Sequence, residues 1–86
     1  MGLFSRKNND WPTALAAIDE WGDEGDWVFY SGSFKVNGEF YTVQGRFEHA
    51  VLNKKAERFL ERMERSPQLT VRYNPSDPSD NEAEID

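Results

Sequence analysis

The side chains that could carry out chemistry are few in this chain. His49 is the only histidine, and the carboxylate beside it, Glu48, would point to the opposite face of a strand. A general base needs an orienting partner and a nearby nucleophile, and the sequence places neither beside His49. The chain has no cysteine, which excludes thiol catalysis and zinc thiolate sites. We therefore predict no catalytic residue, no cofactor and no enzymatic activity.

A cluster of carboxylates is the second chemical candidate. Calcium prefers several carboxylates on a flexible loop, and Gly22 and Gly25 lie within this segment. The ligand spacing and the closing glutamate of an EF-hand loop are absent, so we predict a solvated turn and no metal site. A weaker hypothesis is that these charges attract a basic partner. The cluster consists of Asp19, Glu20, Asp23, Glu24 and Asp26.

The charge balance argues against nucleic acid as a partner. The chain has 16 acidic and 10 basic residues, and its net charge of −6 repels phosphate backbones. The basic residues that cluster are interleaved with glutamates, which is typical of a solvated helix face. These basic residues are Lys54, Lys55, Arg58, Arg62 and Arg65. We predict that the protein does not bind nucleic acid.

A β-hairpin at Asn37-Gly38 is the element that positions most of the remaining candidates. Asn-Gly between strand-like runs is typical of a type I′ turn, which needs positive φ at both central residues. Pairing Val36 with Glu39 and stepping outward gives one continuous apolar face. On that inner face a large residue lies opposite each glycine and covers it. These pairs are Tyr30 with Gly45 and Val43 with Gly32.

The outer face of the same hairpin carries three large aromatic residues, Trp27, Phe29 and Phe40. Tryptophan is enriched in binding hot spots, so these residues form a candidate protein-contact patch. A small barrel closing on itself, or Trp11 folding across, would bury the same residues instead. Our leading hypothesis is a non-catalytic protein-interaction module that uses this face or an exposed edge strand. Its partner would be another protein or a second copy of the chain.

A pocket between helix and sheet is the alternative hypothesis. A small ligand-binding protein or enzyme of this kind would use Tyr30, Tyr41 and His49. Convergence of these polar groups on an apolar cavity would favour it, and a solidly packed inner face would count against it.

A helix and a further strand follow the hairpin. The helix is predicted over Asn53–Arg65, with Asn53 as N-cap and Pro67 ending it. Its apolar stripe is predicted to cover the inner face of the sheet. The stripe consists of Ala56, Phe59, Leu60 and Met63. Alternating apolar residues over 69–73 then predict a strand with one buried side.

The two ends of the chain are predicted to lie outside the folded core. Residues 74–79 contain two X-Pro steps that should end the sheet, and the acidic residues 80–86 should form a disordered tail. Residues 1–10 are predicted to be flexible, which leaves 11–79 as a single domain. We find no signal-peptide or membrane-spanning stretch, so we expect a cytoplasmic protein without membrane contact.

Residues 13–21 fit either a helix or a strand, and their propensity slightly favours a helix. The chain resembles the bacterial domain of unknown function 3592. The resemblance rests on Trp11-Pro12-Thr13, on the Val36-Asn37-Gly38 hairpin and on a closing Val-x-Tyr-Asn-Pro-x-Asp-Pro run over 71–78. It implies that a strand follows Trp-Pro-Thr, and it implies no activity. We therefore expect an α+β fold, in which a twisted antiparallel sheet of about four strands carries one helix on one face.

Overall fold

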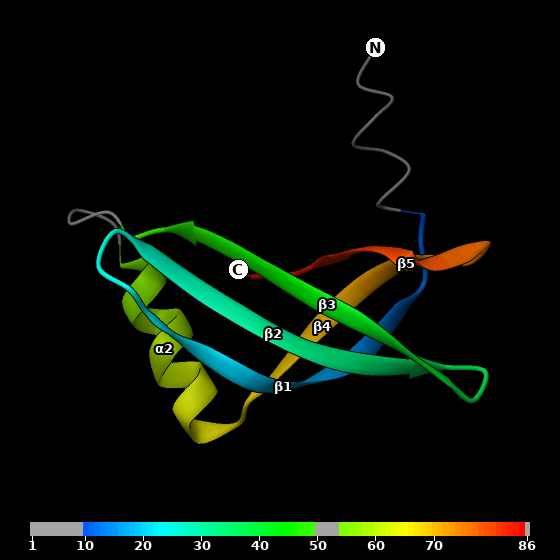
Figure 1. Ribbon diagram of the computed structural model, residues 1–86, viewed down its shortest axis with the longest axis horizontal. Coiled ribbons are helices and arrows are strands. Elements are labelled where there is room, and N and C mark those ends of the chain that lie inside the picture. The colour runs from blue at the N-terminus through cyan, green and yellow to red at the C-terminus, as the bar shows by residue number, and fades with distance from the viewer. Residues whose placement is uncertain (1–9, 50–53, 86) are drawn as a thin grey trace, which may run out of the picture.

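The computed structural model describes residues 10–49 and 54–85, which form one antiparallel sheet and one helix (Figure 1). The elements are β1 (Thr13–Asp23), β2 (Trp27–Val36), β3 (Glu39–Glu48), α2 (Lys55–Arg65), β4 (Gln68–Asn74) and β5 (Asp77–Ala83). The strand order is β3-β2-β1-β4-β5. This arrangement confirms an antiparallel sheet with one helix, but the sheet has five strands where about four were predicted. The predicted flexible start, except Asp10, lies outside the described residues.

The hairpin forms as the sequence predicts. Asn37 and Gly38 have φ angles of 51° and 86°, as a type I′ turn requires. The register pairs Val36 with Glu39 and continues without a shift to Trp27 and Glu48. Local turn chemistry therefore fixes the face of every residue in β2 and β3.

Residues 13–23 form a strand, so the slight helical preference of this segment is overridden. β1 lies in the centre of the sheet and pairs with β2 on one side and with β4 on the other. Ala16 and Ile18 are buried on its inner face, and the register shifts between Ile18 and Glu20, where Asp19 is the extra residue. Backbone pairing on both edges outweighs the weak intrinsic preference of alanine for helices.

Both inner-face glycines allow close packing, but for different reasons. A Cβ on Gly45 would lie 2.5 Å from the Tyr30 hydroxyl oxygen, so the Tyr30 side chain covers Gly45 as predicted. A Cβ on Gly32 would lie 2.1 Å from the carbonyl oxygen of Ala17, which belongs to the neighbouring strand. Gly32 therefore lets the backbone of β1 approach β2, a role that the predicted pairing with Val43 did not include.

The helix α2 packs its apolar side against one end of the sheet's inner face (Figure 1). Ala56, Phe59 and Met63 are buried as predicted, and Leu60 is partly buried. The Phe59 ring centre lies 5.7 Å from that of Tyr30 and 5.4 Å from that of Phe47. The N-cap is Lys54, whereas the predicted N-cap, Asn53, lies outside the described residues.

The predicted disordered tail is wrong for residues 80–83, which belong to β5. The segment that was expected to end the sheet is a tight turn, in which the Asn74 side-chain oxygen accepts the Ser76 N–H at 2.9 Å. β5 is an edge strand, where Pro78 can be accommodated. Its inward residues Asn81 and Ala83 alternate with acidic residues that face outward. Pairing with β4 thus orders a sequence whose composition is typical of disorder.

The five strands curl toward a barrel. The ring of Phe34 on β2 lies 5.8 Å from that of Tyr73 on β4, although β1 separates these strands in the sheet. At the two edges of the sheet, the Asn81 side-chain amide on β5 donates to the Thr42 carbonyl of β3 at 3.1 Å. The edge strands therefore face each other, and the core lies between the curled sheet and α2 (Figure 1).

Candidate functional site

Two strands place an aromatic and cationic cluster on the outer face of the sheet. Arg46 on β3 pairs with Phe29 on β2, and its guanidinium carbon lies 4.5 Å from the Trp27 ring centre. Trp27 is 37% exposed and Phe29 is partly buried. We call these three residues, Trp27, Phe29 and Arg46, the Trp27 surface. Stacking on the tryptophan holds the arginine in place while its donors remain accessible.

A shallow depression of about 370 Å³ adjoins the Trp27 surface. Polar side chains from three strands, among them Ser31 and Gln44, contribute to its lining. Besides Phe29 and Arg46 from the cluster, it is lined by Glu20, Tyr30, Ser31, Gln44 and Gly45. The depression thus places hydrogen-bonding groups beside an apolar surface.

Phe40, the third predicted member of the patch, lies elsewhere. It is 69% exposed and pairs with Lys35 beside the hairpin turn, where the Lys35 ammonium lies 5.1 Å from its ring centre. Six residues of β2 separate Phe29 from Lys35, which is about 20 Å along an extended strand. The structure therefore brings Trp27 and Phe29 together and leaves Phe40 apart. Leu15 on β1 is also exposed, at 60%, and sequence analysis did not single it out.

The residues of the predicted pocket do not converge. Tyr41 and His49 lie eight residues apart along the β3 segment, which is about 26 Å in an extended chain. Tyr41 contacts Phe34 and its hydroxyl donates to the Glu39 carboxylate at 3.0 Å. Tyr30 lies between them, opposite Gly45, with its ring packed near Phe59. The inner face at these positions is packed with aromatic rings.

Tyr30 is the most buried of the three, at 8% exposure. Its burial raises the pKa of the hydroxyl above the usual 10.0, and the Glu82 carboxylate adds to the rise. The pKa of Tyr41 is also raised, first by the hydrogen bond to Glu39 and then by burial and by the nearby carboxylates. Both effects favour the neutral phenol in the folded protein.

The raised pKa of Tyr30 predicts an alkaline loss of stability. Because the unfolded chain releases this proton near pH 10 and the folded chain only above it, the stabilisation is complete below pH 10 and is lost as pH rises toward the folded pKa. Urea unfolding between pH 8 and 11 should show a steeper loss for the wild type than for Tyr30→Phe. Tyr41→Phe, at a more exposed site, should change the slope less. Parallel profiles for wild type and Tyr30→Phe would contradict the prediction.

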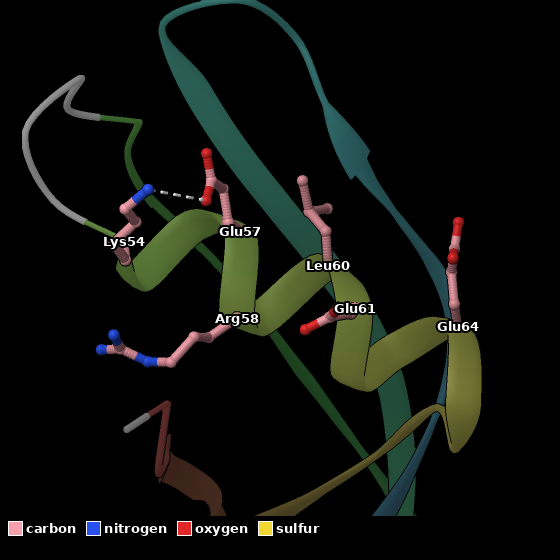
Figure 2. Close-up of a pocket in the computed structure, with 6 residues that line it drawn as sticks. All are labelled: Lys54, Glu57, Arg58, Leu60, Glu61 and Glu64. Atoms are coloured by element: carbon pink, nitrogen blue, oxygen red, sulfur yellow. Dashed lines mark ion pairs between the residues drawn. The ribbon is translucent and has the colours of Figure 1, made fainter.

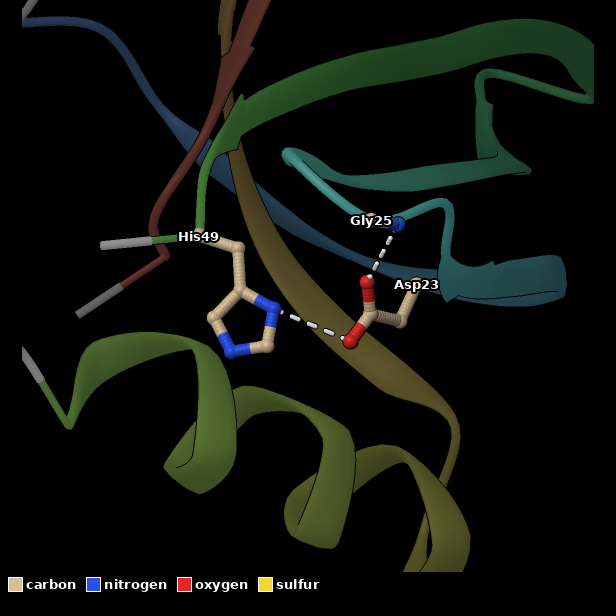
Figure 3. A network of polar contacts seen from close by, with 3 residues as sticks. All are labelled: Asp23, Gly25 and His49. Atoms are coloured by element: carbon tan, nitrogen blue, oxygen red, sulfur yellow. Dashed lines mark hydrogen bonds and ion pairs between the residues drawn. The ribbon is translucent and has the colours of Figure 1, made fainter. Parts of the chain in front are cut away.

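His49 has an orienting partner that sequence analysis missed. Its Nδ1 lies 2.9 Å from an oxygen of Asp23, whose other oxygen accepts the Gly25 N–H at 2.9 Å (Figure 3). The backbone N–H of His49 also donates to the Asp26 carbonyl at 2.9 Å. These contacts tie the end of β3 to the turn between β1 and β2. No pattern links Asp23 to His49 in the sequence, because 26 residues separate them.

A family model with the description Domain of unknown function (DUF3592) matches residues 14–85. The chain belongs to this family. The match includes the hairpin and the closing run over 71–78, and the Trp-Pro-Thr start lies just before it. Neither the comparison with curated proteins nor the comparison with solved structures found a match.

The exposed side of α2 in this DUF3592 domain carries mixed charges around a second depression (Figure 2). Lys54 and Glu57 form an ion pair of 3.6 Å there, and both side chains are more than two-thirds exposed. Within residues 10–49 and 54–85, no three metal-ligating side chains are grouped, and no helix is long and apolar enough to span a membrane.

Proposed function

We propose that this DUF3592 chain is a cytoplasmic, non-catalytic protein-interaction module that binds its partner through the Trp27 surface. The observation that carries the proposal is the stacking of the Arg46 guanidinium on a tryptophan that is 37% exposed. Tryptophan and arginine are enriched in binding hot spots. Because Arg46 is already held on the Trp27 ring, its ordering costs less free energy when a partner binds.

The outer face is a better candidate than an edge strand. The Asn81 side chain donates a hydrogen bond to the Thr42 carbonyl where β5 faces β3. This backbone group of the β3 edge is therefore already paired within the chain. The Trp27 surface, by contrast, has the depression beside it, in which Ser31 and Gln44 can bond to a partner. An apolar anchor with polar groups around it is the usual anatomy of a protein contact.

Affinity capture with matched variants tests the proposal. Wild type, Trp27→Ser and Phe40→Ser would be used to capture proteins from a native extract, and the captured protein would then be titrated against each variant. We expect Trp27→Ser to weaken binding by about 30-fold or more, as loss of a hot spot does. Phe40→Ser removes an exposed aromatic residue about 20 Å away and should bind normally.

Two outcomes would count against this function. One is a partner that binds Trp27→Ser as tightly as it binds the wild type. The other is an equal loss in both variants, which would indicate a contact through general surface hydrophobicity. Circular dichroism and thermal unfolding of each variant check that the fold is retained. Sedimentation equilibrium would reveal whether the partner is a second copy of the chain.

A further inference from the structure

A row of cations follows one side of α2 and lines a groove of about 330 Å³. The cations are Lys55, Arg58, Arg62 and Arg65, at successive spacings of three, four and three residues. This spacing keeps them on one side of the helix. Arg58 leaves α2 on the side away from Leu60 and from the Lys54–Glu57 pair (Figure 2). Arg58 lines both this groove and the mixed-charge depression, whereas Lys55, Arg62 and Arg65 line the groove and not that depression.

The groove has apolar walls in addition to its charges. Phe59, which is 2% exposed, lies at the helix side, and the partly buried Ile85 belongs to the segment that follows β5. Glu61 is the acidic residue in the lining. Four cations and one carboxylate give this groove a positive charge, although the whole chain has a net charge of −6.

Two of these cations, Arg62 and Arg65, have no acidic partner in the part of the chain that the structure describes. Both lie in the last turn of α2, where a cation is favoured by the helix dipole. Their charges are therefore compatible with the fold and remain available to an anionic ligand.

The dimensions of the row fit an extended chain better than a compact anion. From Lys55 to Arg65 the helix rises about 15 Å, and neighbouring cations are about 5 Å apart along its axis. In an extended peptide, three carboxylates at alternate positions span about 13 Å. A single phosphate group could contact only part of this row. The apolar walls would receive the small apolar side chains that alternate with the carboxylates.

From this match we propose that the groove between α2 and the segment that follows β5 binds an extended acidic peptide of a partner protein. Its ligand has carboxylates at alternate positions and small apolar residues between them. Lys55, Arg58, Arg62 and Arg65 contact the carboxylates, and Ile85 contacts the apolar side chains. The site is separate from the Trp27 surface and gives the chain a second contact.

Calorimetric titration with a synthetic peptide tests this site. The probe is a blocked ten-residue peptide in which glutamate alternates with alanine around a central isoleucine. Wild-type protein should bind it saturably and more weakly as salt is raised. Arg62→Glu should weaken binding at least about tenfold. Lys54→Glu makes the same charge change outside the groove and should bind normally, as should Trp27→Ser.

Titration of Trp27→Ser distinguishes this site from the proposed function. Peptide binding in the groove and partner binding through the Trp27 surface are measured separately, so either proposal can be contradicted without the other. Arg62→Gln serves as a milder variant if Arg62→Glu does not fold by circular dichroism, and it should also weaken binding. The proposal is overturned if the peptide does not bind or if Lys54→Glu weakens binding as much as Arg62→Glu. Equal binding of the matching glutamine peptide would overturn it, as would tighter binding of pyrophosphate or of a short single-stranded oligonucleotide.

Discussion

Replacing Gly32 with alanine should lower the free energy of unfolding by about 3 kcal/mol, at the upper end of the usual cost of overpacking. The new Cβ would lie 2.1 Å from the Ala17 carbonyl oxygen and 2.8 Å from the Ile18 Cα. Both are backbone atoms of the central strand, so neither can move without disturbing the pairing of β1 with β2. The melting temperature should fall by about 12 to 24 °C.

Gly22→Ala is the matched control for this experiment. At Gly22, which also lies on the β1–β2 pair, the nearest atom to a new Cβ is in the Phe29 ring at 3.1 Å. A side chain can rotate by the few tenths of an ångström needed, so we expect a change of less than about 1 kcal/mol. Urea unfolding of the two variants measures the difference. Equal stabilities would mean that β1 does not need to approach β2 as closely as described.

The second large effect is expected from Phe34→Ala. Phe34 is 2% exposed, and its ring contacts Tyr41 on β3 and Tyr73 on β4 at centre distances of 5.9 and 5.8 Å. The substitution removes the ring through which β2 contacts both β3 and β4 on the inner face of the curled sheet. The loss should be about 3 to 5 kcal/mol, the usual cost of deleting a buried phenylalanine.

Phe40→Ala is the comparison for Phe34→Ala, because the same side chain is deleted from the outer face of the hairpin. Phe40 is 69% exposed, so we expect a change within about 0.5 kcal/mol. Chemical denaturation of both variants reports the two losses. If Phe34→Ala cost no more than Phe40→Ala, the inner face would not be the packed core.

The features that sequence analysis predicted correctly are those determined by local chemistry. Asn37 and Gly38 specify their turn, and the turn specifies the register of ten residue pairs between β2 and β3 without any help from the rest of the chain. The apolar stripe of α2 is likewise a local pattern. The same register also separates Phe29 from Phe40, because their partners Arg46 and Lys35 lie far apart along the hairpin, and the predicted three-residue patch did not take this separation into account.

The features that propensity and composition do not predict depend on contacts between distant segments. β1 is a strand because β2 and β4 pair with its two edges, and the family resemblance indicated this where propensity did not. The acidic residues 80–83 are ordered because β4 offers them a partner strand, with Ala83 opposite Val71. The contact of His49 with Asp23 and the wall that Ile85 adds to the cationic groove arise in the same way. Composition alone contains no information about such partners.

The meeting of β3 and β5 has a consequence for the solubility of the folded protein. A strand at the edge of a sheet exposes unpaired backbone groups that can template aggregation with other chains. Here the two edge strands face each other, and the Asn81 side-chain amide donates a hydrogen bond to the Thr42 carbonyl. The outward acidic residues of β5 add like charges that repel a second copy. The curl of the sheet therefore protects both of its edges without closing the hydrogen-bonded ladder.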